Sequence, residues 1–293
     1  MAAFSDFGAA NMHTTHSIPL PDGGTLVLGP RPVLMGILNV TPDSFSDGGR
    51  FNLVNEAVSH ARAMVAEGAD IIDIGGESTR PGAETVSVQE ELDRVIPVIE
   101  ALVAEGIGVP LSIDSYKPLV ADQAIQSGAS IINDVHGLQG DPDMAAVAAL
   151  HKVPVIAMHW DRARDATEPL REAVRRYFDT TIALAEKNGI DADRLILDPG
   201  YGFAKTVAEN YALLRDLREI YPARPMLVGT SRKSMIGKLL GNEPHERLAG
   251  TIATTVLGYM GGGHIFRVHD IRPNRDALRV AQATLYGLTE ESR

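Results

Sequence analysis

The sequence has 293 residues, a net charge of −11 at pH 7 and no cysteine, with 44% hydrophobic and 22% charged residues. This length fits one large α/β barrel domain or two smaller domains, and the composition is that of a globular enzyme with an adequate core. The acidic balance argues against nucleic acid or an anionic membrane surface as main partner, and the lack of cysteine excludes disulfides and thiolate metal sites.

The N-terminal residues 1–16 lack the basic start and the apolar run of a secretory signal, so we expect a flexible tail and a cytoplasmic protein. No segment approaches the roughly 18 consecutive apolar residues that indicate a membrane span. We expect residues 17–293 to form a single domain, because no stretch has the composition of a linker. Residues 19–29 predict a hairpin that covers one end of the fold, with an Asp-Gly-Gly turn at 22–24.

From residue 33 onward, short apolar strands alternate with segments whose apolar residues have helical spacing. The predicted strands span 33–38, 71–74, 111–113, 130–132, 153–158, 195–197, 226–228 and 265–268. The predicted helices span 53–67, 88–104, 117–127, 141–151, 167–188, 206–220, 245–260 and 273–287. Continuous apolar strands with helical crossovers indicate a parallel sheet, and about eight such units predict a single (β/α)₈ TIM barrel. An open doubly wound sheet is the alternative.

Almost every predicted strand ends in a side chain that can carry charge or form hydrogen bonds. In chain order these are Asn39, Asp73 with Glu77, Asp114, Asn133, His159, Asp198, Ser231 with Lys233, and Arg267 with His269. Sites on this fold lie at the C-terminal ends of the strands, so this ring of polar residues predicts the site. The alternative for any one of them is a polar residue that merely begins a loop.

The stretch 197–205 indicates what the site binds. Asp198 ends an apolar strand, Pro199 and Gly200 turn the chain, and Phe203 follows closely. A carboxylate at this place can accept two parallel hydrogen bonds from a flat heterocycle with N–H donors, and the heterocycle can lie against Phe203. The alternative is a strand-ending turn with a solvated carboxylate.

The ring of polar strand ends also divides by charge. The groups that suit a neutral ring rich in donors are Asp114, Asn133 and Asp198. The basic groups after the last two strands, where such barrels often bind phosphate, are Lys233, Arg267 and His269. Residues 229–234 open a helix whose N–H groups could add to anion binding.

Two predicted loops stand out by composition. Residues 41–51 form a long loop with Phe45, Phe51 and two glycines, and residues 78–83 follow the second strand. Such loops are typical of lids that close over a substrate and exclude water. They are equally consistent with plain surface loops whose aromatic rings pack down.

Taken together, these motifs resemble those of the dihydropteroate synthases, the pterin-condensing enzymes of folate synthesis. The resemblance covers most of residues 33–280 and rests on GILNVTPDSFSDGG at 36–49, DIGGESTRPG at 73–82, and segments at 112–118, 131–135, 197–200, 229–234 and 267–270. The sequence departs from the commonest family pattern at Tyr201, Ala204 and residues 115–116. None of these departures removes a group named above.

The resemblance implies a reaction that joins 7,8-dihydropterin-6-ylmethyl diphosphate to 4-aminobenzoate with Mg²⁺, in a homodimer. Its pterin-binding residues would be Asp114, Asn133, Met158, Asp198 and Lys233. The diphosphate would be bound by Asn39, Arg80, Arg267 and His269, and Asn39 would also hold the metal. Aminobenzoate would be bound by Phe45, Thr79, Arg80, Pro81, Phe203 and Ser234. The catalytic residues would be Lys233, Arg267 and His269.

This chemistry needs positive charge near the departing diphosphate and no strong base, because a neutral arylamine is already nucleophilic. The sequence agrees, since it contains no nucleophile-elbow motif and no cysteine. Two alternatives remain at this point. A pterin-binding barrel of the corrinoid methyltransferase type would not need the pair Arg267 and His269 or the loop at 41–51. A non-catalytic paralogue would bind pterin without condensing it.

Overall fold

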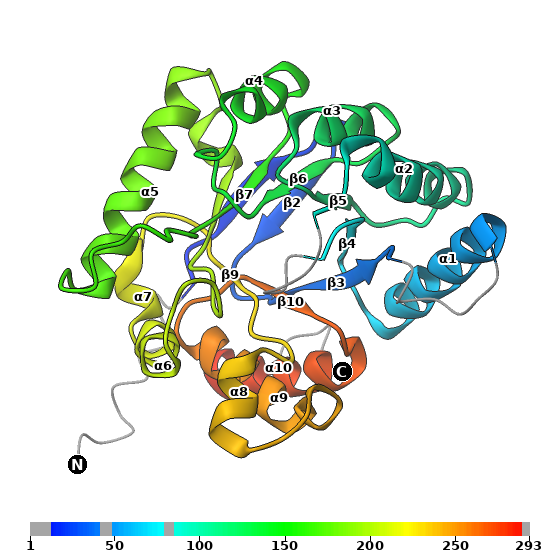
Figure 1. Ribbon diagram of the computed structural model, residues 1–293. Coiled ribbons are helices and arrows are strands. Elements are labelled where there is room, and N and C mark those ends of the chain that lie inside the picture. Colours follow the sequence, from blue (N-terminus) through cyan, green and yellow to red (C-terminus); the bar gives the residue numbers. More distant parts are fainter. Residues whose placement is uncertain (1–12, 42–48, 79–84, 289–293) are drawn as a thin grey trace, which may run out of the picture.

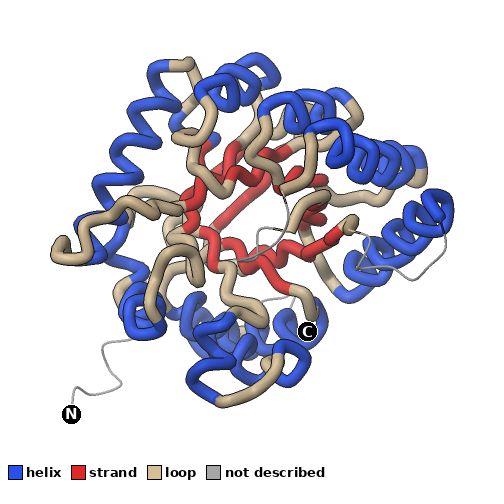
Figure 2. Tube along the Cα trace, viewed as in Figure 1, coloured by secondary structure: helices blue, strands red, loops and turns tan. Residues whose placement is uncertain are grey.

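The computed structural model describes residues 13–41, 49–78 and 85–288, with only the backbone at 49–52. Within these ranges, eight parallel strands form a ring that helices surround (Figure 1, Figure 2). The ring strands are β3 (Val33–Asn39), β4 (Ile71–Gly75), β5 (Leu111–Asp114), β6 (Ile131–Asp134), β7 (Val155–Met158), β8 (Leu195–Asp198), β9 (Leu227–Val228) and β10 (Ile265–Val268). The helices are α1 (Gly49–Glu67), α2 (Val88–Ala104), α3 (Pro118–Gln126), α4 (Pro142–His151), α5 (Leu170–Lys187), α6 (Val207–Arg215), α7 (Leu217–Ile220), α8 (Ser234–Leu240), α9 (Leu248–Met260) and α10 (Ile271–Tyr286).

The sheet closes on itself, which distinguishes a barrel from an open doubly wound sheet. Its strands are hydrogen-bonded in the order β8-β7-β6-β5-β4-β3-β10-β9. The two ends of this order meet where Leu197 of β8 forms a parallel bridge with Met226, just before β9. The Leu197 N–H also donates to the Pro225 carbonyl at 3.0 Å. The predicted (β/α)₈ barrel is therefore confirmed.

The inward-facing side chains change from apolar to polar along several strands. Because side chains alternate between the two faces of a strand, residues two apart point to the same side. The inner apolar residues and their polar successors are Ile71 and Asp73, Ile131 and Asn133, Ile196 and Asp198, and Ile265 and Arg267. The barrel interior is thus an apolar core at one end and a polar mouth at the other.

An antiparallel hairpin fills the apolar end of the barrel. It consists of β1 (His16–Pro19) and β2 (Thr25–Leu28), joined by the predicted turn. Its residues Ile18, Leu20, Leu26 and Leu28 belong to the same apolar cluster as the first inner residues of the ring strands. The predicted hairpin over one end is confirmed, and it leaves the C-terminal ends of the strands as the open end.

The chain is already packed at the end of the segment expected to be a tail. His13 is buried, its ring stacks on Tyr259 at 4.4 Å, and its Nδ1 lies 2.6 Å from the Tyr286 hydroxyl. Burial lowers the pKa of His13 to about 4, so this packed ring is neutral. The domain therefore includes residues from 13 onward, and residues 1–12 lie outside the described part of the chain.

The helices lie where they were predicted to within a few residues at their ends, and two of the predicted segments are interrupted. The segment 206–220 forms two helices, α6 and α7, which meet at Asp216. The segment predicted as a helix from residue 245 begins as a 3₁₀ turn, Pro244–Glu246, and continues as α9. The residues expected to open a helix at 229–234 do so, because α8 begins at Ser234. No described helix combines the length and apolar character needed to cross a bilayer.

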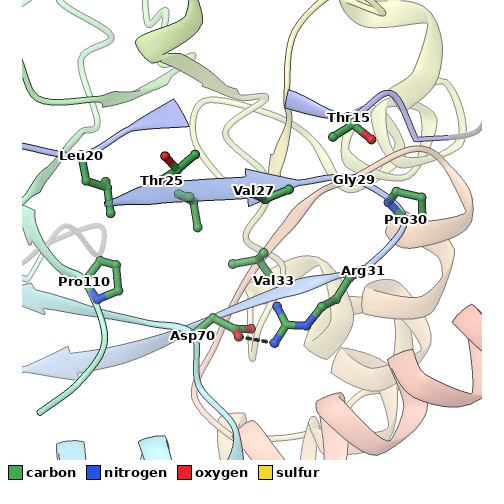
Figure 3. Close-up of a pocket in the computed structure, with 11 residues that line it drawn as sticks. Thr15, Leu20, Thr25, Val27, Gly29, Pro30, Arg31, Val33, Asp70 and Pro110 are labelled. Atoms are coloured by element: carbon green, nitrogen blue, oxygen red, sulfur yellow. Dashed lines mark hydrogen bonds and ion pairs between the residues drawn. The ribbon is translucent and has the colours of Figure 1, made fainter. Parts of the chain in front are cut away.

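A pocket of about 360 Å³ lies between the hairpin and the base of the barrel (Figure 3). It is lined by aliphatic groups such as Val27 and Val33 and by the ion pair of Arg31 with Asp70, whose atoms are 2.6 Å apart. Asp70 also accepts the Leu34 N–H at 2.8 Å, so its charge already has partners. This pocket is at the end opposite the polar mouth and is not the predicted site.

Candidate active site

The polar strand ends converge at the mouth of the barrel. Asp114 of β5 lies in register with Asn133 of β6, and Met158 of β7 lies in register with Asp198 of β8. Met158 is only 3% exposed, and its register with Asp198 puts an apolar residue beside that carboxylate. The prediction that these strand ends form one cluster is thereby supported by the strand register itself.

Arg267 of β10 joins carboxylates from two other strands. Its Nε donates to Asp73 Oδ2 at 2.6 Å, and its Nη2 donates to Asp114 Oδ2 at 2.6 Å. Asn133 Nδ2 donates to the same Asp73 oxygen at 3.0 Å. Asp73 is completely buried, and its Oδ1 has no hydrogen-bond partner among the described residues. One polar network therefore spans β4, β5, β6 and β10.

Asp198 and Lys233 form the other half of the cluster. Asp198 is 5% exposed, and its Oδ1 accepts the Gly200 N–H at 2.8 Å. Its Oδ2 accepts no hydrogen bond within the described chain. Lys233 Nζ donates to the Tyr201 carbonyl and lies 4.7 Å from the centre of the Phe203 ring. The loop after β8 is thus attached to both charged groups.

Burial and pairing shift the ionisation of these groups. Burial raises the pKa of Asp114 to about 7, against the attraction of Arg267. Burial also raises the pKa of Asp198, and it lowers the pKa of Lys233 to about 8 although Asp198 opposes this. Burial disfavours the charge on Arg267 too, but Asp73 and Asp114 more than offset it and raise its pKa. Shifts of this kind are concentrated at functional sites.

The chain after β10 adds a further basic group. His269 Nδ1 lies 2.9 Å from the Ser231 hydroxyl, and the His269 N–H donates to that hydroxyl at 3.2 Å. Next to them, Arg232 pairs with Asp270 through Nε at 3.1 Å and Nη2 at 2.6 Å. Two contacts therefore join the loop after β9 to the end of β10 and fix the position of His269.

Asn39, the last residue of β3, has a partly exposed side chain. In the described ranges, no three His, Cys, Asp or Glu side chains are grouped as a metal cage. Mg²⁺ usually keeps several waters and binds through one or two protein groups plus substrate phosphates. The amide oxygen of Asn39 fits such a site. One amide oxygen would therefore suit a magnesium ion whose other ligands are waters and substrate phosphate oxygens.

Aromatic rings line the mouth on the side of β5 to β8. The rings of Phe203 and Trp160 are 5.1 Å apart edge to face, and Trp160 stacks on His136 at 5.1 Å with an angle of 4° between planes. His136 also meets Tyr116 edge to face at 5.0 Å, and the Arg162 guanidinium lies 4.3 Å from the Trp160 ring centre. Phe203 is consequently supported by a continuous row of rings.

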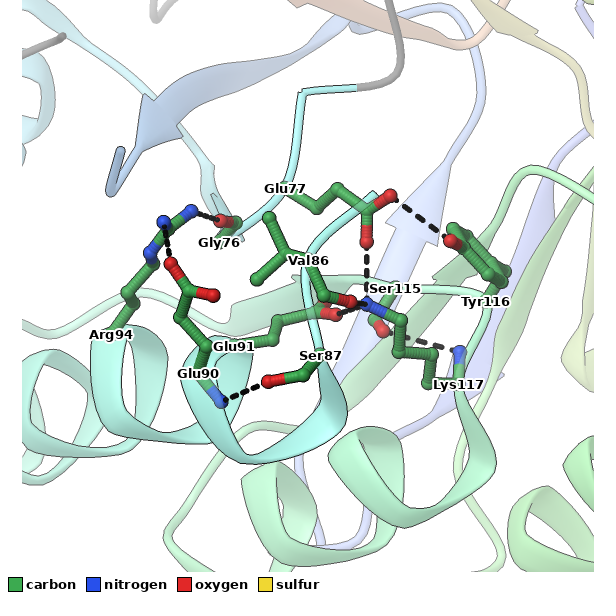
Figure 4. A network of polar contacts seen from close by, with 10 residues as sticks. All are labelled: Gly76, Glu77, Val86, Ser87, Glu90, Glu91, Arg94, Ser115, Tyr116 and Lys117. Atoms are coloured by element: carbon green, nitrogen blue, oxygen red, sulfur yellow. Dashed lines mark hydrogen bonds and ion pairs between the residues drawn. The ribbon is translucent and has the colours of Figure 1, made fainter. Parts of the chain in front are cut away.

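A lysine-centred network anchors the chain that follows β4 (Figure 4). Lys117 Nζ donates to Glu77 Oε2 at 2.5 Å, to Glu91 Oε2 at 2.6 Å and to the Val86 carbonyl at 2.6 Å. Glu77 also accepts the Tyr116 hydroxyl at 3.0 Å. Because Glu77 precedes residues 79–84 and Val86 follows them, one ammonium holds both flanks of this segment.

Comparison with known proteins identifies the family. Residues 35–269 match the family described as pterin binding enzyme. The dihydropteroate synthase of Bacillus subtilis (strain 168) is 50% identical over 244 residues, which cover 83% of this chain and 85% of that protein. The chain belongs to the dihydropteroate synthase family.

Two solved structures of dihydropteroate synthase from Xanthomonas albilineans have the same fold. The structure with 4-aminobenzoic acid has a TM-score of 0.87 and 45% identity, and covers 93% of this chain and 99% of that one. The structure in complex with 7,8-dihydropteroate has a TM-score of 0.81 and 44% identity, and covers 89% and 96%. The resemblance seen in the sequence motifs is confirmed, and these relatives favour a dihydropteroate synthase over a corrinoid methyltransferase barrel.

The structure brings most residues of the family motifs to one place. Those at the mouth of the barrel are Asn39, Asp114, Asn133, Met158, Asp198, Phe203, Lys233, Ser234, Arg267 and His269. Phe45, Thr79, Arg80 and Pro81 lie outside the described residues, and so do the loop segments at 42–48 and 79–84. Their roles remain predictions that follow from family membership.

Several residues at the mouth had no predicted role. Asp73 was only a strand end in the sequence, yet it holds Arg267, and its inward direction follows from its position two residues after Ile71. Lys117 and Lys205 lie within the segments 112–118 and 197–205 that the sequence motifs single out, but neither lysine was given a role there. Trp160 could have been singled out as the one tryptophan of the chain.

Proposed function

We propose that this protein joins 7,8-dihydropterin-6-ylmethyl diphosphate to 4-aminobenzoate and forms 7,8-dihydropteroate and diphosphate. The observation that carries the proposal is the cluster at the mouth, in which three carboxylates and two cations from different strand ends meet, with the apolar side chain of Met158 beside Asp198. A pterin diphosphate needs both, because its ring is rich in N–H donors and its tail is strongly anionic. Membership of the dihydropteroate synthase family supports the same reaction.

We assign pterin recognition to Asp114, Asn133, Asp198 and Lys233. Asp198 retains an Oδ2 that can accept from the pterin, while the Gly200 N–H holds Oδ1 in place. The raised pKa values of Asp114 and Asp198 show that burial disfavours their charged forms. Each N–H that a ligand donates to these carboxylates stabilises the charged form. A neutral heterocycle can enter without leaving any charge of the cluster unpaired.

We assign the diphosphate to Asn39, Arg267 and His269. Arg267 keeps its positive charge because two carboxylates raise its pKa, so it offers a fixed charge where the departing oxygens develop theirs. His269 is oriented by Ser231 toward the same end of β10. Asn39 would hold Mg²⁺, which when bound would neutralise charge on the diphosphate.

In the reaction, the amine nitrogen of aminobenzoate forms a bond to the methylene carbon of the pterin. The bond from that carbon to the diphosphate oxygen breaks, diphosphate leaves with the electron pair, and the amine loses a proton to solvent. Phe203 and Ser234 would bind aminobenzoate beside Lys233, whose ammonium lies over the Phe203 ring. The residues predicted at 45 and 79–81 would complete that side.

The proposal is tested with purified protein, pterin diphosphate, 4-aminobenzoate and Mg²⁺, by following dihydropteroate and diphosphate together. Turnover is expected, whereas pterin binding without turnover would identify a non-catalytic paralogue. The variant Asp198→Asn puts a donor against a donor of the pterin, and losing a buried charge-assisted contact costs about 2–5 kcal/mol. Calorimetry should therefore show pterin affinity at least about tenfold weaker. Unchanged affinity would remove Asp198 from the pterin site.

We also propose a homodimer formed through α9 and its neighbours, which gather on one side of the barrel (Figure 1). α9 carries no charged residue, and Leu257 on α9, Val280 on α10 and Leu239 on α8 are 54%, 69% and 62% exposed. Large contiguous apolar surface is typical of interfaces, so these exposed residues support the proposal. Sedimentation should give a dimer that Leu257→Glu converts to monomer, with Leu150→Glu on α4 as control. A monomeric wild-type protein would contradict this.

The expected cytoplasmic location remains part of the proposal, and cell fractionation tests it.

The assignment of Mg²⁺ is tested by chelation followed by titration with the metal. Turnover should stop on chelation and return with Mg²⁺, and Asn39→Ala should raise the Mg²⁺ concentration that half-restores it. Full activity in the chelator would exclude the metal.

A further inference from the structure

Lys205, in the loop between β8 and α6, is surrounded by hydrogen-bond acceptors. Its Nζ lies 2.9 Å from His159 Nδ1 and donates to the carbonyls of Gly200 at 2.9 Å, Phe203 at 3.1 Å and His159 at 3.4 Å. None of its hydrogen bonds goes to a carboxylate of the described chain. Its hydrogen bonds therefore hold backbone carbonyls in place and do not pair the ammonium with a carboxylate.

The acceptors belong to two different strand ends. His159 follows β7, whereas Gly200 and Phe203 lie in the loop after β8. The two segments are in direct contact, because a Cβ added at Gly200, which has φ +70°, would be 2.1 Å from the His159 carbonyl oxygen. Lys205 therefore closes the loop on itself and holds it against β7.

The same loop is held from its other side by the site. The Tyr201 carbonyl accepts from Lys233, the Phe203 ring lies against the Lys233 ammonium, and the Gly200 N–H donates to Asp198. Successive carbonyls of the loop thus point to two different lysines. Removing either lysine would release part of the backbone that carries Phe203.

We propose that Lys205 is a positioning residue for the aminobenzoate side of the site, which holds Phe203 and its loop in the geometry that binds this substrate. The inference rests on the proposed function for the identity of the substrate. None of the hydrogen bonds of Lys205 goes to Lys233 or Asp198, so its link to the site is the loop backbone. Pterin recognition by the cluster at the strand ends should depend on it much less.

The ammonium state matters, because three N–H donors serve four acceptors and a neutral amine keeps only two. Burial lowers the pKa of Lys205 to about 7, opposed by Asp198 and Glu209 and assisted by the positive charges of Lys233 and Arg164. Burial and the neighbouring Lys205 charge lower the pKa of His159 to about 3, so the ring is neutral, and its Nδ1 accepts from Lys205 when the proton is on Nε2. The loop should loosen as pH rises through about 7.

The test compares Lys205→Met and Lys205→Arg with the wild type between pH 6 and 8.5. In the wild type, KM for aminobenzoate should rise severalfold across this range. In Lys205→Met, KM for aminobenzoate should be at least about tenfold higher than in the wild type at pH 6 and should no longer increase with pH. Pterin affinity should change less than about threefold. Lys205→Arg, which stays charged, should keep KM closer to wild type and remove the rise near pH 7. Any step near pH 8 that persists belongs to Lys233.

A second readout needs no turnover. Trp160 is the only tryptophan, and its ring contacts Phe203, so its emission reports the loop directly. Lys205→Met should shift that emission, and Lys205→Arg should restore it in part. The control is Arg164→Met, which removes a nearby positive charge that pairs with Glu209 and touches none of the four acceptors.

Three results would overturn the role of Lys205. They are an unchanged aminobenzoate KM in Lys205→Met, an equal loss of pterin and aminobenzoate binding, or the same effect from Arg164→Met. If Lys205→Met does not fold, the pH rise in the wild type and its loss in Lys205→Arg decide the matter. A wild-type protein without turnover would instead overturn the proposed reaction, and the Trp160 emission would still decide on Lys205.

Discussion

The bridge made by Arg267 permits a quantitative prediction. Its Nε and Nη2 hold Asp73 and Asp114 at 2.6 Å each, and no single amine can reach both oxygens in this way. In Arg267→Lys one of two charge-assisted hydrogen bonds is lost, and each contributes about 1.5–3 kcal/mol. Because 21% of the Arg267 side chain and 11% of the Asp114 side chain are exposed, solvent screens part of the energy of the hydrogen bond between them. We expect the free energy of unfolding to fall by about 1.5–2 kcal/mol.

Urea denaturation at pH 7 measures this change, with Arg279→Lys on the exposed face of α10 as the matched control. The control should stay within about 0.5 kcal/mol of wild type, as surface substitutions usually do. Arg267→Lys should also weaken binding of pterin diphosphate while pterin without the diphosphate binds almost as before. Equal loss for both ligands would mean that Arg267 only supports the fold, and an unchanged unfolding free energy would refute the energetic role of the bridge.

Three further changes test other parts of the mouth. Ala204 has φ +49°, so Ala204→Gly should raise the unfolding free energy by roughly 0.5–1 kcal/mol in urea, and a decrease would argue against strain there. Lys117→Met removes the cation that pairs with the buried carboxylates of Glu77 and Glu91, and should lower the free energy of unfolding by about 3–5 kcal/mol. A loss under about 1 kcal/mol would show that these carboxylates find other partners. Burial lowers the pKa of His136, so Trp160 emission should be quenched only below pH 6.5, and His136→Gln should abolish that step.

The barrel could be predicted because its strands are buried on both faces. Segments such as Ile71–Ile74 carry continuous apolar or inward-facing residues, and helical spacing between them implies crossovers. The site followed from topology, since parallel strands bring residues as distant in sequence as Asp114 and Arg267 to one end. Helix breaks were harder, because the interruption at Asp216 depends on tertiary packing and no proline or glycine marks it.

Pairing within the site could not be predicted in the same way. A sequence shows that Asp73 and Arg267 point inward, but not that the guanidinium chooses Asp73 and Asp114 over Asp198. That choice depends on distances between strands that only the closed barrel defines. Lys205 was missed for a related reason, since backbone carbonyls have no side-chain identity that could reveal an acceptor cage.

The arrangement of charges gives the site a direction. The carboxylates Asp73, Asp114 and Asp198 stand on β4, β5 and β8, whereas the cations Lys233 and Arg267 follow or belong to β9 and β10. With three negative and two positive groups, the cluster has a formal charge of −1, which a neutral donor-rich ring tolerates and a free diphosphate does not. Under the proposed function, this arrangement favours a pterin diphosphate with its ring among the carboxylates and its tail toward His269. The loop held by Lys205 would then carry Phe203 beside Lys233, on the side where aminobenzoate is proposed to bind.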